Sequence, residues 1–161
     1  MLQTRLSDTS SLSGKYTTEQ LAWLQKARDF ARRVPLSEVM DSDSKNVFRR
    51  DLFEAACKEG LGSLPCPSTY GGSGGDYVSF ALVNEEFGRL CTPIMSSLGV
   101  HVLCQEPIYR FGSEEQKQKY LVPLAKGEKL GAFALSEPEA GSDATSQKTT
   151  AEDKGDYYLL N

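Results

Sequence analysis

The sequence predicts a mainly α-helical fold in which an N-terminal helical bundle leads into the first strands of an incomplete β domain. Apolar residues recur at helical spacing through most of the chain, whereas the last part carries short apolar runs separated by turn residues. The change falls near residue 129. We therefore expect a flexible polar arm over residues 1–16, a helical domain over 17–128 and the start of a β domain over 129–161.

The first predicted helix begins after Thr17. Thr17 and Gln20 have the spacing of a capping box, in which each side chain satisfies a backbone N–H at the helix start. Pro35 ends the helix, because the residue before a proline is pushed out of the helical region. Between these signals an apolar stripe recurs at helical spacing: Trp23, Ala27, Phe30 and Val34.

A second helix is predicted over residues 43–59, with Gly60 as the left-handed residue after its end. The glycine- and proline-rich stretch 61–76 that follows is a loop by composition. Its glycine cluster is not a phosphate-binding loop, because Gly75 is followed by Asp76 instead of the lysine that such a loop needs.

Two longer helices are predicted next, over residues 76–91 and 94–111. Glu85 and Glu86 are adjacent on the first of them, so they point about 100° apart and cannot act together on one substrate atom. We expect these carboxylates to form a solvated or ion-paired face. The second helix opens at Pro93 and is apolar enough to be buried on most sides.

The last part of the chain is predicted to change from helix to strand. Ser113 and Gln116 form a second capping box, and the short helix that they open breaks near Pro123. Three strands and a loop are expected beyond it: a buried strand over 130–135, a turn-rich loop over 136–143, and two hairpin strands over 147–152 and 157–160.

Composition narrows the possible functions. A formal net charge of −4 gives no basic patch for binding nucleic acid, and His101 as the only histidine makes a metal site improbable on sequence grounds. No apolar stretch approaches the ~20 residues that span a bilayer. The four cysteines show no Cys-x-x-Cys spacing, so we expect reduced thiols in a cytosolic protein.

The run Phe133-Ala-Leu-Ser-Glu-Pro-Glu-Ala-Gly-Ser-Asp143 carries the most specific signal, and through it the chain resembles the acyl-CoA dehydrogenase family. The resemblance extends over the chain from about residue 17 onward. Three further stretches agree with the family in order and spacing: Gly60 to Gly74, the pair Glu85 and Glu86, and Gly112 to Glu128.

The resemblance implies a helical domain, a middle β-barrel and a C-terminal four-helix domain, of which this chain would hold the first and the beginning of the second. It also implies FAD as cofactor and α,β-dehydrogenation of an acyl-CoA, in which a carboxylate takes the α-proton while the β-hydrogen leaves as hydride. The family base is a glutamate of the C-terminal domain. We therefore expect the base beyond Asn161, no catalytic residue in this chain, and an inactive chain that binds FAD weakly or not at all.

The motif also suits one wall of a flavin site on physical grounds. Phe133 and Leu135 can lie along the flat ring, and Ser136 offers a hydroxyl to its polar edge. Gly141 lets the chain pass close to a ligand, and the backbone N–H groups around Gly141 and Ser142 can donate to pyrophosphate oxygens. The resemblance implies that Ser142 also contacts the acyl-CoA.

The acyl-chain pocket is expected on the helix over 94–111. Met95, Gly99, Val100 and Leu103 correspond to pocket-lining residues of the family, and their spacing places them on one helix face. The small Gly99 leaves volume for a longer or branched acyl group. Packing in the protein core explains the same pattern equally well.

Other functions remain open at the level of sequence. An acyl-CoA oxidase or a flavin monooxygenase shares the domain layout, and a non-catalytic helical interaction module would keep the helices without binding flavin. The resemblance further implies an electron-transfer flavoprotein as electron acceptor and a homotetramer or other homo-oligomer once the protein is complete. It implies a cytoplasmic location, or the mitochondrial matrix in a eukaryote.

Overall fold

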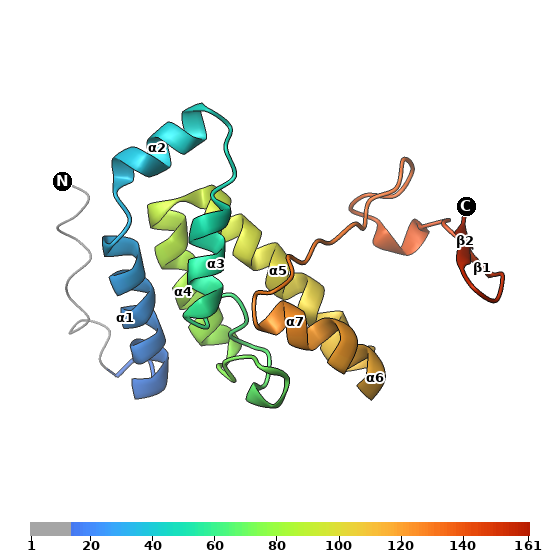
Figure 1. The fold of residues 1–161 in the computed structure, drawn as a ribbon, viewed down its shortest axis with the longest axis horizontal. Coiled ribbons are helices and arrows are strands. Elements are labelled where there is room, and N and C mark those ends of the chain that lie inside the picture. Colours follow the sequence, from blue (N-terminus) through green and yellow to red (C-terminus); the bar gives the residue numbers. More distant parts are fainter. Residues whose placement is uncertain (1–13) are drawn as a thin grey trace.

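The computed structural model describes residues 14–161, and most of them form a bundle of helices (Figure 1). The predicted arm over 1–16 lies largely outside the described residues. The three long helices are α1 (Thr18–Arg32), α4 (Tyr77–Leu90) and α5 (Thr92–Phe111). The shorter helices are α2 (Leu36–Ser44), α3 (Arg50–Lys58), α6 (Glu114–Gln116) and α7 (Val122–Ala125), with a π-helical turn, η4 (Lys117–Leu121), between the last two. The mainly helical fold class is confirmed.

The main hydrophobic core lies where α1, α3, α4 and α5 meet. α1 packs against α4, and both α3 and α4 pack against α5. Phe30 of α1 meets Phe87 of α4 with ring centroids 5.3 Å apart. The other large buried members come from three segments: Phe53, Leu61, Leu64, Ile94 and Leu98. Burying side chains of this size contributes about 1.5–3 kcal/mol each to the stability of the bundle.

Several local signals in the sequence are confirmed. Thr17 and Gln20 form a complete capping box at the start of α1, and Ser113 and Gln116 form another at the start of α6. Gly60 follows α3 with a φ of +77°, the left-handed conformation that glycine adopts without steric cost. The glycine-rich loop 61–76 consists of turns, bends and one short 3₁₀-helix, η3 (Ser68–Tyr70).

The predicted helix over 43–59 is wrong in its boundaries. The structure has two helices instead, α2 and α3, which are separated by a break at Asn46. Asn46 has a φ of +53°, a conformation that asparagine tolerates better than most residues and that ends α2. Pro35 ends α1 as predicted, but it is also the N-cap of α2, because the fixed φ of proline suits the residues that open a helix.

Two expectations for the helices after residue 91 also need correction. α5 is not buried on most sides, because one of its faces packs on the core while Val100, Leu103 and Phe111 are exposed. The helix opened by Ser113 does not break at Pro123 but continues to Ala125. The π-helical turn η4 lies immediately before Pro123, and in it the Val122 N–H donates to the Lys117 carbonyl, so Pro123 follows as the second residue of α7.

The β region is smaller than predicted. β1 (Ala151–Asp153) and β2 (Tyr158–Leu160) form an antiparallel hairpin that lies far from α1 (Figure 1). Thr150 and Asn161 extend the pairing by exchanging backbone hydrogen bonds of 2.9 and 3.1 Å. A short 3₁₀-helix, η5 (Ala144–Ser146), precedes the hairpin. The predicted strand over 130–135 is wrong, because within residues 14–161 it has no neighbouring strand with which to form a ladder.

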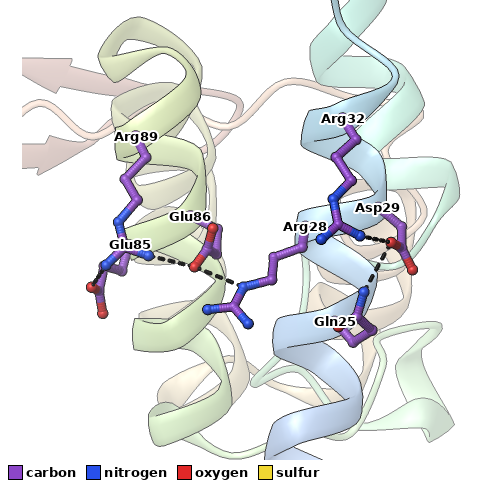
Figure 2. Close-up of polar contacts among 7 residues, drawn as sticks. All are labelled: Gln25, Arg28, Asp29, Arg32, Glu85, Glu86 and Arg89. Atoms are coloured by element: carbon purple, nitrogen blue, oxygen red, sulfur yellow. Dashed lines mark hydrogen bonds and ion pairs between the residues drawn. The ribbon is translucent and has the colours of Figure 1, made fainter. Parts of the chain in front are cut away.

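A buried ion pair joins α1 to α4 (Figure 2). Arg28 Nε lies 3.2 Å from Glu86 Oε1, and the side chains are only 6% and 1% exposed. Arg89 Nη1 contacts the same Glu86 oxygen at 2.5 Å, and its other nitrogen pairs with Glu85. The prediction of an ion-paired face is therefore confirmed, whereas the solvated alternative fits only Glu85, which is 58% exposed.

We expect removal of Glu86 to destabilise the chain far more than removal of its neighbour. Glu86→Leu leaves the buried Arg28 guanidinium without its carboxylate, which costs about 3–5 kcal/mol of unfolding free energy. The double variant Arg28→Met/Glu86→Leu should recover most of that loss, since it replaces both charges with apolar groups. Urea denaturation of the 161-residue chain measures both values.

Glu85→Gln is the matched control, because Glu85 is adjacent in sequence, pairs with the same Arg89 and is exposed. Its expected cost is within about 0.5 kcal/mol. Equal destabilisation by Glu86→Leu and Glu85→Gln would contradict the assignment of a structural role to the buried pair.

Candidate functional site

The segment that carries the sequence motif leaves the helical bundle directly against α5. The backbone N–H of Gly131 donates to His101 Nδ1 over 2.9 Å, and this contact is buried. A Cβ atom on residue 131 would lie 3.0 Å from Cys104 Cβ and 3.1 Å from His101 Nδ1. The absence of a Cβ therefore lets the backbone at Gly131 lie close to α5, whereas a larger residue would crowd these atoms.

His101 is satisfied on both sides of its ring. Because the Gly131 amide can only donate, Nδ1 must be unprotonated, and Nε2 carries the proton that is donated to the Leu124 carbonyl over 3.0 Å. The ring of Phe53 stands edge-on at 5.1 Å between centroids. Burial lowers the pKa of His101 below its ordinary value. The histidine is thus a neutral group that holds two backbone positions.

The chain between these two positions is also anchored. Ser63 Oγ donates to the Ala125 carbonyl over 2.8 Å in a buried hydrogen bond. Gly127 has a φ of +72°, and a Cβ there would lie 2.4 Å from Cys57 Cβ. The connection from α7 to the motif is therefore fixed by the loop after α3, by α3 itself and by α5.

The motif loop over 136–143 is organised by its own carboxylates. Glu137 and Ala140 exchange backbone hydrogen bonds of 2.8 and 3.2 Å, which close a tight turn. The Glu137 carboxylate accepts from the amides of Lys148 and Thr149 at 2.7 and 3.1 Å. Hydrogen bonds from Thr149 and Lys148 lower the pKa of Glu137. Gln147 Nε2 adds a bond of 2.5 Å to the Leu135 carbonyl.

Asp143 and Glu139 have similar local roles. The Asp143 carboxylate accepts from the hydroxyls of Ser146 and Thr145, and these bonds lower its pKa. Glu139 forms an ion pair with Lys148. The carboxylates of Glu137, Glu139 and Asp143 therefore all have partners within residues 137–149.

The predicted flavin-binding residues are all exposed. Phe133 and Leu135 are each 42% exposed, a large fraction for side chains of this kind. Ser136, Gly141 and Ser142 are exposed as well, and a Cβ on Gly141 would meet no atom within 4 Å. Two apolar side chains next to accessible hydroxyl and N–H groups suit a flat ring with a polar edge.

The predicted acyl-pocket residues do not share one open face. Met95 packs against the main core and lies 4.0 Å from the Cβ position of Gly88 in α4, and a Cβ on Gly99 would lie 3.9 Å from Asn84 Oδ1 of the same helix. Val100 is exposed, and Leu103 is 48% exposed. Met95 and Gly99 therefore lie where α5 contacts α4, whereas Val100 and Leu103 lie on the exposed side of α5.

The described cysteines and acidic residues form no reactive or metal-binding cluster. Within residues 14–161 no group of three or more His, Cys, Asp and Glu side chains could hold a metal ion. All four cysteines are free, and burial raises the pKa of Cys57 to about 12 and that of Cys66 to about 11. Thiols with such pKa values are not nucleophiles at neutral pH. No helix among the described residues is long and apolar enough to cross a membrane.

Sequence reasoning missed the two residues that connect the motif to the bundle, His101 and Gly131. A signal existed for each. His101 is the only histidine and stands in an apolar helix, where a polar side chain needs a partner. Gly131 interrupts the apolar run 130–135, and a glycine within such a run marks close approach of the backbone to another group.

Comparisons with known proteins cover nearly the whole chain. The family model described as "Acyl-CoA dehydrogenase, N-terminal domain" matches residues 17–128. An acyl-CoA dehydrogenase of Bacillus subtilis (strain 168) is 44% identical over 148 residues, which are 90% of this chain and 38% of that protein. A subunit of the caffeyl-CoA reductase-Etf complex of Acetobacterium woodii is 41% identical over 149 residues, which are 91% of this chain and 39% of that protein.

A solved structure agrees with these matches. An acyl-CoA dehydrogenase of Bacillus anthracis complexed with FAD has a TM-score of 0.82 to this chain at 38% identity. The match covers 92% of this chain and 27% of that one. The chain thus spans 38% or 39% of the length of the curated relatives named above.

We expect the unfolding free energy to fall as the pH is lowered from about 7.5 to 5.5. His101 is neutral in the folded chain, but in the unfolded chain it binds a proton near its ordinary pKa of about 6.5. The unfolded state therefore binds more protons, so the stability present above pH ~6.5 is lost on acidification by at most about 1.4 kcal/mol per pH unit. Urea denaturation over a pH series measures the slope.

The control is His101→Asn, which removes the only histidine. The slope between about pH 7 and 5.5 should flatten in this variant, because carboxylates titrate mainly below that range. An unchanged slope would show that another group causes the pH dependence.

Proposed function

Because the chain belongs to the acyl-CoA dehydrogenase family, we propose that it is the N-terminal part of an FAD-dependent enzyme that removes hydrogen from the α and β carbons of an acyl-CoA thioester. The observation that supports this proposal best is the motif segment, which is fixed to α5 at Gly131 and then exposes Phe133, Leu135 and Ser136. Apolar side chains that a folded chain leaves uncovered beside polar backbone are typical of a ligand site.

The exposed groups fit FAD in chemistry. Phe133 and Leu135 offer apolar contact to a flat ring, and Ser136 offers a hydroxyl to its polar edge. The N–H groups around Gly141 and Ser142 can donate to pyrophosphate oxygens, because no side chain on Gly141 blocks the approach. When bound, the flavin supplies the acceptor for the hydride from the β-carbon. The residues of this chain hold one side of that site and exclude water from it.

Substrate contacts are proposed on the same side. Ser142 contacts the acyl-CoA, and Leu103 lines the acyl chain from the open side of α5. Met95 and Gly99 contribute from the α4 side, where the small Gly99 leaves space. Both residues lie on the side of α5 that faces α4, so they would bound the acyl chain from that side.

The α-proton acceptor is proposed to come from another part of the protein. Hydrogen bonds lower the pKa values of Glu137 and Asp143, which makes both carboxylates weaker bases than ordinary ones. Glu86 is buried in its pair with Arg28 and cannot reach a ligand. These three described carboxylates therefore form structural hydrogen bonds and ion pairs.

Partners and location complete the proposal. We propose an electron-transfer flavoprotein as electron acceptor, since a relative at 41% identity is named as a subunit of a complex with Etf. A homo-oligomer, and a cytoplasmic or mitochondrial-matrix location, remain part of the proposal. Free thiols at every cysteine agree with a reducing compartment.

We expect the full-length protein that contains this chain to be isolated with FAD and to lose its visible flavin absorption when acyl-CoA is added without oxygen. An added electron acceptor should restore the absorption. Ser142→Ala should raise KM for acyl-CoA by about three- to tenfold with little change in kcat, because it removes a contact worth about 1 kcal/mol that is equally strong in the ground state and the transition state. Steady-state kinetics with acyl-CoAs of different length measure this.

Thr145→Ala is the matched control, since the Thr145 hydroxyl bonds to Asp143 within the same loop. Its KM should stay within about twofold of the unmodified protein. Absence of flavin, or steady oxygen consumption without another acceptor, would overturn the assignment as a dehydrogenase.

A further inference from the structure

We propose that His101 is a positioning residue for the flavin and thioester site, because it fixes the backbone of Gly131 at the start of the motif segment. This inference rests on the function proposed above. His101 touches neither ligand. It acts through the chain that carries Phe133, Leu135 and Ser136.

The first argument is geometric. His101 binds both ends of the connection between α7 and the motif, since Nε2 donates to the Leu124 carbonyl and Nδ1 accepts from the Gly131 amide. Phe133 follows the held amide by two residues, which places it within about 7 Å of chain length from α5. A shift of the Gly131 backbone would therefore move Phe133 and Leu135 by almost the same distance.

The second argument is the fit between the two residues. A Cβ on residue 131 would lie 3.1 Å from His101 Nδ1 and 3.0 Å from Cys104 Cβ. The absence of a side chain on Gly131 thus allows the hydrogen bond of 2.9 Å. An apolar residue at position 101 could also pack against Phe53, but it could not hold a backbone amide.

The third argument is that the segment has little else to hold it near α5. Within the described part of the chain, residues 130–135 form no strand ladder. Gln147 bonds to the Leu135 carbonyl at the far end of the segment. The contact with His101 at the near end is buried, where a hydrogen bond is protected from exchange with water.

Two amide variants separate positioning from simple core packing. The Oδ1 atom of asparagine takes about the place of Nδ1, so His101→Asn can still accept from Gly131 while it loses Leu124. The Nε2 atom of glutamine reaches about the place of the histidine Nε2, so His101→Gln can still donate to Leu124 while it loses Gly131. Each variant keeps one hydrogen bond and remains uncharged.

The readouts are hydrogen exchange of the Gly131 amide in the 161-residue chain and FAD affinity of the full-length protein. We expect His101→Gln to speed exchange at Gly131 and to weaken FAD binding about tenfold. His101→Asn should keep the protection and stay within about threefold of the original affinity. Gly131→Ala, which leaves His101 intact, should resemble His101→Gln in FAD affinity.

Equal FAD affinity and equal Gly131 exchange in the two amide variants would overturn the proposal and leave His101 as a packing residue. The same experiment distinguishes failure of the proposed function. If the unmodified full-length protein binds no FAD, the proposed function fails and with it the role in that site. Gly131 exchange in the two variants would then still show whether His101 holds the segment.

Discussion

The structure depends on how closely the chain after α7 approaches α5. A Cβ at position 131 would crowd His101 and Cys104 at 3.1 and 3.0 Å, and a neutral histidine with its proton on Nε2 serves both Leu124 and Gly131. The buried hydrogen bond from the Gly131 N–H to His101 Nδ1 therefore ties the start of the motif segment to the helical bundle. Gln147 and the carboxylates of Glu137 and Asp143 then shape the loop that follows.

The buried ion pair of Arg28 and Glu86 differs from the neutral His101 in that its hydrogen bonding within residues 14–161 is incomplete. Arg28 and Glu86 bind α1 to α4 within the core, and their unsatisfied atoms, Arg28 Nη1 and Glu86 Oε2, show that the pairing among described residues is incomplete. Replacing such a pair with apolar residues is often neutral or stabilising. The pair joins α1 to α4, and α4 packs in turn on α5.

The sequence predicted the parts of the fold that depend on local chemistry. Both capping boxes and the left-handed Gly60 need only neighbouring residues, and they are present as expected. The sequence-based predictions failed where the structure of a segment depends on residues far away in the chain. The run 130–135 looks like a buried strand but has no ladder partner in the described chain, and the burial of Glu86 depends on Arg28, which is 58 positions away. Arg28 could have been suspected, because it lies between the core residues Leu24 and Ala27 and the partly buried Ala31.

An acidic loop is an unexpected place to bind an anionic cofactor, and the local hydrogen bonds explain how it could. Glu137 directs its carboxylate to the amides of Lys148 and Thr149, Asp143 directs its own to two hydroxyls, and Glu139 is paired with Lys148. These partners lie on the C-terminal side of the loop. The backbone N–H groups around Gly141 are left as the donors nearest a phosphate, so recognition there would depend on oriented N–H dipoles and not on net positive charge.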